Sequence, residues 1–304
     1  MIRTFHHEDF AAPQLAEQKA RQGHVVSVCL PARDEAATVG GIVSDLHRSL
    51  VEGCGLVDEV LVIDDSSSDA TAQVAAAAGA VVVDATSTLA DYGTGPGKGM
   101  AMWKTIYAAS GDIVVWCDAD VTNFAPHFVT GLLGPLLTDD NIAYVKGFYR
   151  RPLSAAGDGG GRVTELVARP LMSLFFPELN AFMQPLSGEY AGRRRLFEQL
   201  PFVAGYGVEV GLLIDIASGW GIDVMAQVDL GTRLHRNRTL GELGPQAMTI
   251  MQVILRRAIP GEVAETAELI RPGMTPASVG AHELPPMITV APYVSGRTGR
   301  AKFS

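Results

Sequence analysis

Cysteine is scarce in this sequence: Cys29, Cys54 and Cys117 are the only three among 304 residues. They form no CxxC pair and no spacing typical of a zinc site. Cys29 and Cys117 lie inside apolar, strand-like runs, where a free cysteine behaves as a small hydrophobic side chain. We therefore expect no disulfide framework, and we predict that the protein works in the reducing cytoplasm.

Long hydrophobic runs are also missing. No stretch of about 18 apolar residues occurs, so the sequence predicts no membrane-spanning helix. The first residues, MIRTFHHEDF, carry two histidines and two acidic residues where a signal peptide would have an apolar core. A membrane-anchored or secreted protein is therefore not expected.

Positive charge is in deficit, with 24 Lys and Arg against 33 Asp and Glu and a net charge of -9. An acidic protein repels polyanions, so we expect no nucleic-acid partner, although a local basic pocket for a small anion stays compatible with this balance. Hydrophobic residues make up 47% of the chain, which is typical of a globular protein with a sizeable core. The length suits one large domain or two modest ones.

Short apolar runs alternate with helical patterns through the first half of the chain. After a helix at 13–23, the pattern predicts strands at 25–30, 57–63, 80–83 and 113–117, separated by helices at 35–51, 70–78 and 98–109. Strands that are apolar along their whole length, alternating with helices, indicate a parallel sheet covered on both faces. The predicted fold class is therefore α/β.

The pattern changes in the second half. It predicts a strand at 142–149, a glycine-rich loop at 154–161, helices at 162–176, 207–219 and 240–258, a short element at 186–191, a strand at 222–228 and a basic loop at 230–239. From residue 259 the chain has six prolines in 46 residues, which predicts an extended or partly disordered arm. We interpret the run Arg193-Arg194-Arg195 as a solvent-exposed charged face.

Polar residues cluster where three of the early strands end, at 31–35, 64–69 and 118–120. Open α/β sheets bind ligands at the carboxyl ends of their strands. Three separate strands are therefore expected to deliver carboxylates to one edge of the sheet.

Asp118-Ala119-Asp120 follows an apolar strand directly. Two carboxylates one residue apart can converge on one hard divalent cation, which keeps open positions for substrate phosphates. The alternative is a solvated turn in which an aspartate caps a helix. The pair alone does not decide between these interpretations.

The run Asp64 to Asp69 holds three acids and three serines, which is more than helix capping requires. Together with Pro31 to Glu35 on the neighbouring strand, it predicts a nucleoside pocket. The loop Gly93 to Gly99 is not a phosphate-binding P-loop, because Tyr92 and Gly99 stand where that motif needs a glycine and a hydroxyl. Lys98 still lies at a predicted helix start, where it can contact a nucleotide or phosphate.

Four of these segments, LPARDEAATVG, VIDDSSSDAT, GPGKG and WCDAD, stand in an order that resembles the GT-A glycosyltransferases. Later segments are more distinctive: GGGRVTELVARPL, QPLSGEYAG, GYGVEVGLLID and VDLGTRLHRNR resemble the glucosyl-3-phosphoglycerate synthase family. The resemblance extends over about residues 25–258.

This resemblance implies an α/β fold of the GT-A (Rossmann-like) type, a nucleotide-sugar-binding sheet with a smaller acceptor-binding part. The expected division is an N-terminal helical extension (1–24), a nucleotide-sugar half (25–150), an acceptor half (151–258) and a proline-rich arm (259–304). The implied reaction moves glucose from UDP-glucose to the 2-hydroxyl of 3-phosphoglycerate with retention of configuration. In that family it is the first step of methylglucose lipopolysaccharide-type synthesis. A homodimer is also expected.

The resemblance also implies roles for individual residues. The residues matched to the nucleotide-sugar site are Pro31, Ala32, Arg33, Glu35, Asp65, Lys98, Asp118, Ala119, Asp120 and Glu209. Those matched to the acceptor site are Gly161, Arg162, Thr164 and Asn237. Asp120 and His235 would bind Mg²⁺ or Mn²⁺, and the residues expected to act in catalysis are Asp120, Glu209 and Arg162. Relatives often carry Ser or Gly where this chain has Asp65 and Ser66, so the resemblance supports a role for Asp65 less strongly than one for Asp120.

Taken alone, His235 among arginines is typical of a surface histidine, and Arg162 of an exposed arginine. Other transferases remain alternatives, namely a mannosyl-3-phosphoglycerate synthase or a polyprenyl-phosphate glycosyltransferase. A nucleotidyltransferase would need a glycine-rich signature after the first strand, and a non-catalytic binding module would release no UDP. Release of UDP from UDP-glucose, with and without acceptor and metal, discriminates between these hypotheses.

Overall fold

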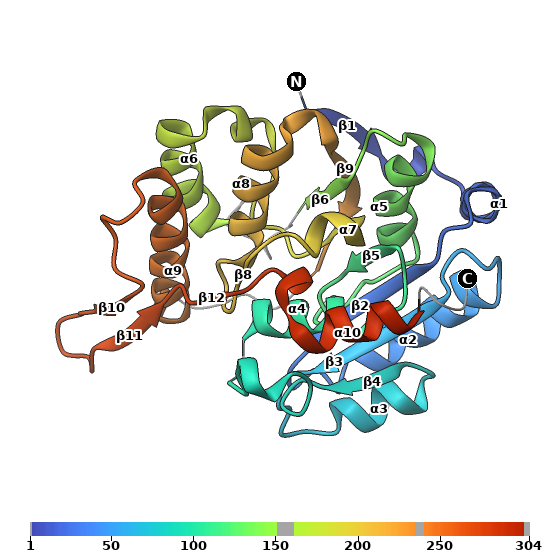
Figure 1. Cartoon of the computed structure of the whole chain (residues 1–304), viewed down its shortest axis with the longest axis horizontal. Helices are drawn as coiled ribbons and strands as arrows, with labels where there is room; N and C mark the ends of the chain where they lie inside the picture. The colour runs from blue at the N-terminus through green and yellow to red at the C-terminus, as the bar shows by residue number, and fades with distance from the viewer. Residues whose placement is uncertain (1, 96, 151–160, 235–239, 301–304) are drawn as a thin grey trace.

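An eight-stranded sheet forms the centre of the molecule (Figure 1). The computed structural model describes residues 2–95, 97–150, 161–234 and 240–300. The strands follow one another across the sheet in the order β1 (Arg3–His6), β9 (Met225–Thr232), β6 (Tyr144–Arg150), β7 (Tyr190–Arg193), β5 (Ile113–Trp116), β2 (Val26–Ala32), β3 (Glu59–Asp64) and β4 (Val81–Asp84). All neighbours pair in parallel except β7, which runs antiparallel to both β5 and β6. The predicted α/β class and mainly parallel sheet are confirmed.

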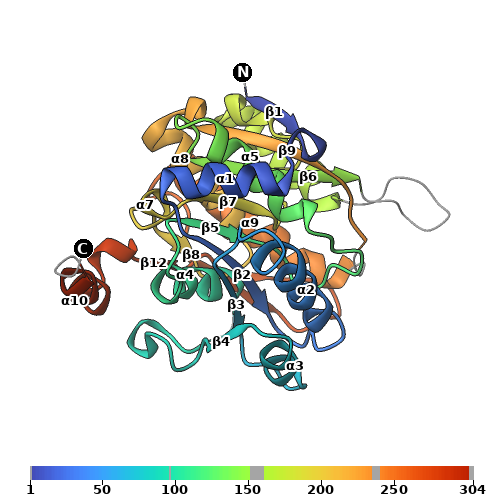
Figure 2. The same cartoon turned by 90° about the vertical axis from the view of Figure 1, so that its right-hand side faces the viewer.

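Alternating side chains of the central strands enter two separate cores. Val28 of β2 and Val115 of β5 pack on one face, while Cys29 and Trp116 pack on the other. Successive side chains of a strand point to opposite faces, so an apolar strand needs helices on both sides. Figure 2 shows the sheet between its covering helices.

The first face is covered by α1 (Ala12–Gln22), α2 (Val39–Leu46) with the following π-helical turn η2 (His47–Val51), α3 (Thr71–Ala77) and α5 (His127–Thr138). The second face is covered by α4 (Lys98–Ala108), α6 (Arg169–Phe175), α7 (Arg194–Phe197), α8 (Val208–Trp220) and α9 (Leu240–Ala258). A π-helical turn, η4 (Thr164–Ala168), leads directly into α6. Short 3-10 turns lie at η1 (His7–Asp9), η3 (Ala90–Tyr92), η5 (Pro177–Ala181) and η6 (Ile222–Val224). Each predicted helix from residue 13 to 258 thus has a counterpart.

The end of the chain is folded, so the prediction of an extended or partly disordered arm was wrong for its described part. β10 (Thr266–Leu269) pairs antiparallel with β11 (Ala277–Gly280), and β12 (Glu283–Leu284) pairs with β8 (Phe202–Val203). The segment then continues through η7 (Met287–Thr289) into α10 (Ala291–Arg300). The buried side chains of Leu284, Met287, Val290 and Tyr293 anchor it to the second core. Five of the six prolines of this segment lie between the elements, and the sixth, Pro292, lies in the first turn of α10, where a helix tolerates proline.

The arginine run was also interpreted wrongly. Arg193 and Arg194 are only 7% and 9% exposed, whereas Arg195 is exposed. Arg193 donates to the carbonyls of Ile142 and Leu136, and Arg194 donates to those of Gly111, Ile106 and Ala109. Buried carbonyl oxygens at loop ends need donors, and a guanidinium supplies several at once.

The structure also bears on the cysteines and on the absence of long hydrophobic runs. All three cysteines are free, and Cys29 and Cys117 are buried in the sheet. No helix within the described residues is long and apolar enough to cross a membrane.

Candidate nucleotide-sugar and metal site

The ends of β2, β3 and β5 meet at one edge of the sheet and border a cavity of about 310 Å³. The residues that line it are Pro31, Ala32, Arg33, Glu35, Asp65, Gly97, Lys98, Ala101, Asp118, Ala119, Asp120 and Tyr206. Nine of the ten residues matched to the nucleotide-sugar site therefore border one cavity. The tenth, Glu209, lies beside it in the first turn of α8.

The loop after β3 is held to the loop after β2. Asp34 accepts hydrogen bonds from the amide and hydroxyl of Ser68, and Asp69 accepts from the amides of Ala36 and Thr71. These contacts use the outer acids of the two loops. They leave Asp65 at the cavity wall, where its Oδ2 accepts from the amide of Gly97 at 2.9 Å. Burial raises the pKa of Asp65, against the opposing effects of that amide and of Arg33.

The glycines around Lys98 allow two backbones to pack closely. A Cβ at Gly97 would lie 2.4 Å from the carbonyl oxygen of Ala204, and one at Gly99 would lie 1.7 Å from that of Val203. Only glycine permits this approach. Tight packing of the start of α4 against residues 203–204 thus explains the glycine loop without a P-loop, and it fixes Lys98 at the cavity.

Lys98 links two carboxylates from different elements. Its Nζ lies 2.6 Å from Asp118 Oδ1 and 2.7 Å from Glu209 Oε1. Burial alone would lower the pKa of Lys98, but the two carboxylates outweigh it and raise that pKa. The amine is therefore a fixed positive charge in the wall of the cavity.

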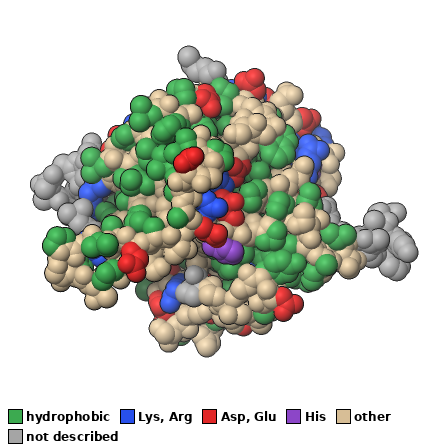
Figure 3. Space-filling model, turned by 60° about the vertical axis from the view of Figure 1, so that its left-hand side comes forward, with side chains coloured by type: hydrophobic (Ala, Val, Ile, Leu, Met, Phe, Trp, Pro, Cys, Tyr) green, Lys and Arg blue, Asp and Glu red, His purple; other side chains and the backbone are tan. Residues whose placement is uncertain are grey.

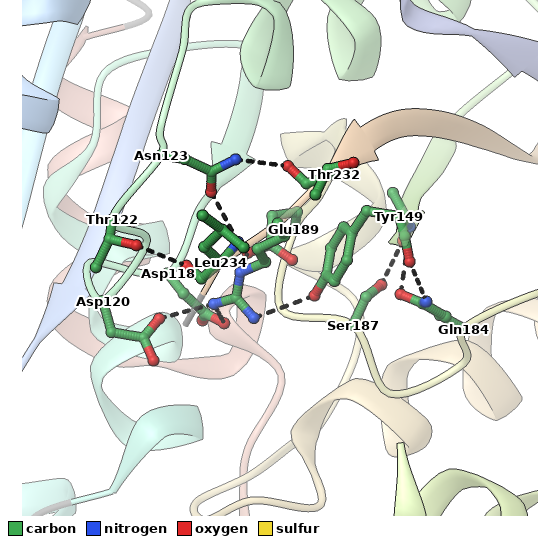
Figure 4. A network of polar contacts seen from close by, with 12 residues as sticks. Asp118, Asp120, Thr122, Asn123, Tyr149, Gln184, Ser187, Glu189, Thr232 and Leu234 are labelled. Carbon is green, nitrogen blue, oxygen red and sulfur yellow. Dashed lines mark hydrogen bonds and ion pairs between the residues drawn. The ribbon is translucent and has the colours of Figure 1, made fainter. Parts of the chain in front are cut away.

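A second cation, Arg233 at the end of β9, holds the Asp-x-Asp pair. Its Nη2 lies 2.8 Å from Asp118 Oδ2 and 2.7 Å from Asp120 Oδ1. On its other sides, Nε lies 3.1 Å from Glu189 Oε1 and Nη1 donates to the hydroxyl of Tyr149 at 3.2 Å. Figure 4 shows the side chains of Asp118, Asp120, Glu189 and Tyr149 converging at this point.

Glu189 reaches this site because β7 is antiparallel. The start of β7 lies beside the ends of β5 and β6, since Tyr190 pairs with Trp116 and Lys146. Glu189 itself is 0% exposed. Burial raises its pKa while Arg233 opposes that rise, and Glu189 is in turn the largest of the causes that raise the pKa of Arg233.

The loop that carries Arg233 is fastened to the residues after Asp120. Asn123 donates to the carbonyl of Thr232 and accepts from the amide of Leu234, and Thr122 donates to the carbonyl of Leu234 (Figure 4). His235 and Asn237 follow but lie outside the described residues, so the predictions made for them stay predictions.

A buried lysine lies behind the site. Lys146 of β6 donates to the carbonyl of Ser187 at 2.9 Å and stands 4.5 Å from the centre of the Tyr190 ring. Burial lowers the pKa of Lys146 to about 7, although Glu209 opposes the shift. At neutral pH, Lys98 and Arg233 are therefore the fully charged cations among the described residues of this network. They face the four carboxylates of Asp118, Asp120, Glu189 and Glu209.

This donor set fits a divalent cation. Two carboxylate oxygens, from Asp118 and Asp120, contact one nitrogen atom of Arg233, so they face a common point at the cavity wall. Hard oxygen ligands and an excess of negative charge are what Mg²⁺ and Mn²⁺ prefer.

The acceptor residues of the described part lie together elsewhere. Gly161, with φ of +79°, precedes the helix that begins with Arg162, and Thr164 is buried in its first turn. None of the three lines the cavity. They therefore define a separate group at the start of the η4–α6 helix.

Comparison with known proteins decides the family. The chain is 42% identical to the glucosyl-3-phosphoglycerate synthase of Petrotoga mobilis, over 96% of this chain and 95% of that protein. The chain belongs to the glucosyl-3-phosphoglycerate synthase family. Residues 27–202 also match the model of glycosyl transferase family 2.

Solved structures of this family have the same fold. The Mycobacterium tuberculosis glucosyl-3-phosphoglycerate synthase with Mn²⁺, UDP-glucose and phosphoglyceric acid has a TM-score of 0.86 and 42% identity, covering 95% of this chain and 98% of that one. A structure of the same enzyme with Mg²⁺ and UDP has a TM-score of 0.83 and 45% identity, over 95% and 99%. The structure of the mannosyl-3-phosphoglycerate synthase of Rubrobacter xylanophilus has a TM-score of 0.85 and 38% identity, covering 95% of this chain and 97% of that one.

Sequence reasoning missed Gly188 and Glu189, although both lie in the segment QPLSGEYAG that carried part of the family resemblance. It placed Arg233 within a basic loop at 230–239, whereas the guanidinium contacts the carboxylates of Asp118, Asp120 and Glu189. No spacing rule connects residues 188–189 with residue 118. The antiparallel insertion of β7 brings them together, and a single sequence does not reveal it.

We expect Gly188→Ala to lower kcat by about tenfold to a hundredfold while the fold persists. A Cβ there would lie 2.3 Å from Asp118 Oδ2 and 2.4 Å from Oδ1, so the carboxylate must turn away from its position. A misplacement of about 1 Å at a reacting centre costs on the order of 100-fold. The measurements are initial rates of UDP release and the melting temperature. Gly219→Ala, where a Cβ meets nothing within 4 Å, is the matched control. Equal rates for the two variants would contradict the assignment.

Proposed function

We propose that this enzyme transfers glucose from UDP-glucose to the 2-hydroxyl of 3-phosphoglycerate, with retention of configuration and with Mg²⁺ or Mn²⁺ as cofactor. The observation that carries this proposal is the cavity at the strand ends, where the carboxylates of Asp118 and Asp120 both contact Arg233. The Petrotoga mobilis glucosyl-3-phosphoglycerate synthase supports the proposal, because this chain is 42% identical to that protein over 95% of its length. The Mn²⁺ and Mg²⁺ complexes of the Mycobacterium tuberculosis enzyme with uridine nucleotides support the cofactor.

The donor would lie in the cavity with its base and ribose between the loops after β2 and β3. Asp65 and Glu35 offer hydrogen-bond acceptors there, and Arg33 adds a positive charge. The diphosphate would extend toward Asp118 and Asp120. A divalent ion held by Asp120 and His235 would offset the charge that develops on this leaving group.

The residues of the chain then orient the two substrates. Lys98 fixes Asp118 and Glu209 on either side of its amine, so both carboxylates keep their places as the donor binds. Arg162, with five donors in a planar fork, is suited to grip the phosphate or carboxylate of the acceptor. Gly161, Thr164 and Asn237 complete the proposed acceptor site.

Our preferred route to retention is a single front-face step. The acceptor hydroxyl attacks from the same face of the sugar that the leaving group leaves, and the leaving phosphate takes its proton. A double displacement would need a carboxylate nucleophile, and Glu209 is the candidate. Its ion pair with Lys98 at 2.7 Å supports a role in holding glucose hydroxyls instead. Trapping a covalent glucosyl adduct on Glu209 would overturn the front-face route.

The test is UDP release with a panel of donors, acceptors and metals. We expect turnover with UDP-glucose and 3-phosphoglycerate that depends on Mg²⁺ or Mn²⁺ and stops without the acceptor. The second candidate is mannosyl transfer, which the similarity to the Rubrobacter xylanophilus enzyme favours. Faster turnover with GDP-mannose than with UDP-glucose would replace the first proposal by the second.

Arg162→Ala is expected to raise KM for 3-phosphoglycerate by about tenfold to a hundredfold and to leave KM for UDP-glucose nearly unchanged. Losing one charge-assisted hydrogen bond to an anion costs about 1.5–3 kcal/mol. Steady-state kinetics with each substrate varied in turn measure the effect. Arg169→Ala, which removes a surface pair with Glu165, is the control. Equal losses for both substrates would mean that Arg162 is not an acceptor clamp.

A homodimer and a cytoplasmic location are part of this proposal. Hydrophobic side chains are exposed at Leu166, Leu174, Phe175 and Met183, on and beside the η4–α6 helix, and they offer an apolar surface to a second copy. Figure 3 shows hydrophobic side chains over much of the face that this side of the molecule presents, with charged side chains of both signs at a hollow near its middle. The free cysteines support a reducing compartment. Light scattering after size exclusion measures the oligomeric state.

A further inference from the structure

Glu189 is a fully buried acid that the proposed reaction does not use. It precedes β7, and that strand runs antiparallel to its neighbours, so the first residues of β7 lie at the sheet edge where Asp118 follows β5. The carbonyl of Glu189 accepts from the amide of Gly147 at 2.8 Å, which fixes its backbone to β6. The backbone that carries this carboxylate is therefore tied to the sheet at the residue before β7 begins.

Among the described residues, the cation in contact with the carboxylate of Glu189 is Arg233, which also binds the Asp-x-Asp pair. Arg233 is 4% exposed, and its Nε lies 3.1 Å from Glu189 Oε1. The neighbouring nitrogen of the same guanidinium, Nη2, contacts Asp118 and Asp120. The phenol of Tyr149 fixes the third side, with its ring 5.3 Å from the guanidinium carbon.

This arrangement divides one positive charge between two groups of carboxylates. A guanidinium is planar and delocalised, so a carboxylate beside its Nε restrains the plane in which Nη2 lies and also offsets part of the positive charge. Without Glu189, the whole charge of Arg233 would act on Asp118 and Asp120. It would then compete with any divalent ion for the same oxygens.

We propose that Glu189 is a positioning residue that acts through Arg233: it restrains the guanidinium at Nε and offsets part of its charge, so that Asp118 and Asp120 stay available to the divalent ion. This inference rests on the proposed function, because it takes these aspartates as the metal carboxylates. It assigns to Glu189 no contact with substrate. Its effect on the metal passes through the arginine.

The test is titration calorimetry of Mn²⁺ into protein saturated with UDP, which needs no turnover. Glu189→Gln keeps the shape and removes the charge, and we expect its Kd for Mn²⁺ to rise by about tenfold. In the Arg233→Met background, the same substitution should change Kd by less than about twofold, because the group through which Glu189 acts is gone. The same factor in both backgrounds, or an unchanged Kd in the single variant, would overturn the proposal.

The Mn²⁺ concentration needed for half-maximal transfer is a second measurement, and a purely structural role of Glu189 would leave it unchanged. The Glu189→Gln enzyme should need about tenfold more Mn²⁺ for half-maximal transfer, and excess Mn²⁺ should restore its rate. Failure of excess Mn²⁺ to restore the rate counts against the proposal. Glu198→Gln, at a buried acid bonded to Tyr293, is the matched control and should keep the wild-type Kd.

Two further variants complete the set. If Glu189→Gln does not fold, Tyr149→Phe replaces it: loss of the hydroxyl that holds Nη1 should weaken Mn²⁺ binding in the same direction, and an unchanged Kd would overturn the positioning role. Asp120→Asn separates this inference from the proposed function. Wild-type Mn²⁺ affinity in that variant would refute the metal site itself, whatever Glu189 does.

Discussion

Asp120→Asn is expected to lower metal-dependent transfer by about a thousandfold or more. The side chain keeps its size, but a neutral amide replaces one of the two carboxylates that face a common point. A bound metal ion stabilises developing charge by several kcal/mol, and about 4 kcal/mol corresponds to about a thousandfold in rate. UDP release at saturating substrates, over a range of Mn²⁺ concentrations, measures the loss.

The same substitution should abolish the calorimetric Mn²⁺ signal while the melting temperature changes little, because Asp120 is only partly buried. Asp45→Asn, which disturbs a surface pair with Arg48 on α2, is the control and should retain full activity. Full activity in Asp120→Asn would refute the assignment of this aspartate to the metal.

Lys98→Met is expected to destabilise the fold by about 3–5 kcal/mol and to raise KM for UDP-glucose. The variant leaves Asp118 and Glu209 without the cation that lies between them, and breaking a buried pair by removing one partner costs about this much. Since the pKa of Lys98 is raised above its ordinary value of 10.5, its contribution is fully present below that pH. It is lost as the pH rises through the folded value.

The stability difference between wild type and Lys98→Met should therefore stay nearly constant from about pH 6 to about pH 9. Chemical denaturation at several pH values measures it. Lys19→Met removes another lysine–carboxylate pair, with Asp58, that lies away from the cavity, and this control should leave KM for UDP-glucose unchanged. A Lys98 variant with wild-type stability and KM would contradict the role of its amine.

The first half of the molecule could be predicted in detail because its signals are local. Apolar strands, their polar ends and the Asp-x-Asp pair follow one another within about 95 residues, and the parallel topology brings those ends to one edge. These local signals, together with the family resemblance, assigned Asp65, Lys98 and Asp120 to one site, and all three line one cavity.

The features that sequence reasoning missed depend on long-range packing. Arg194 looks like a surface charge in a run of three, yet its donors satisfy carbonyls at Gly111 and Ala109 that are distant in sequence. Glu189 meets Arg233 only because β7 enters the sheet in reverse. The C-terminal segment looked polar and proline-rich, but its few apolar residues fill gaps in a core made by earlier elements.

The pairing of β1 with β9 also sets a schedule for folding during synthesis. Arg3–His6 is made more than 200 residues before its partner strand, Met225–Thr232. At about 5–20 residues per second, the ribosome needs roughly 10 to 45 seconds to bridge that interval. Until then the first strand has no neighbour, and the edge of β9 that it covers does not yet exist. The edge strand β1 can therefore join the sheet only late in synthesis. Its pairing with β9 is a contact of very high sequence separation, and such contacts form slowly.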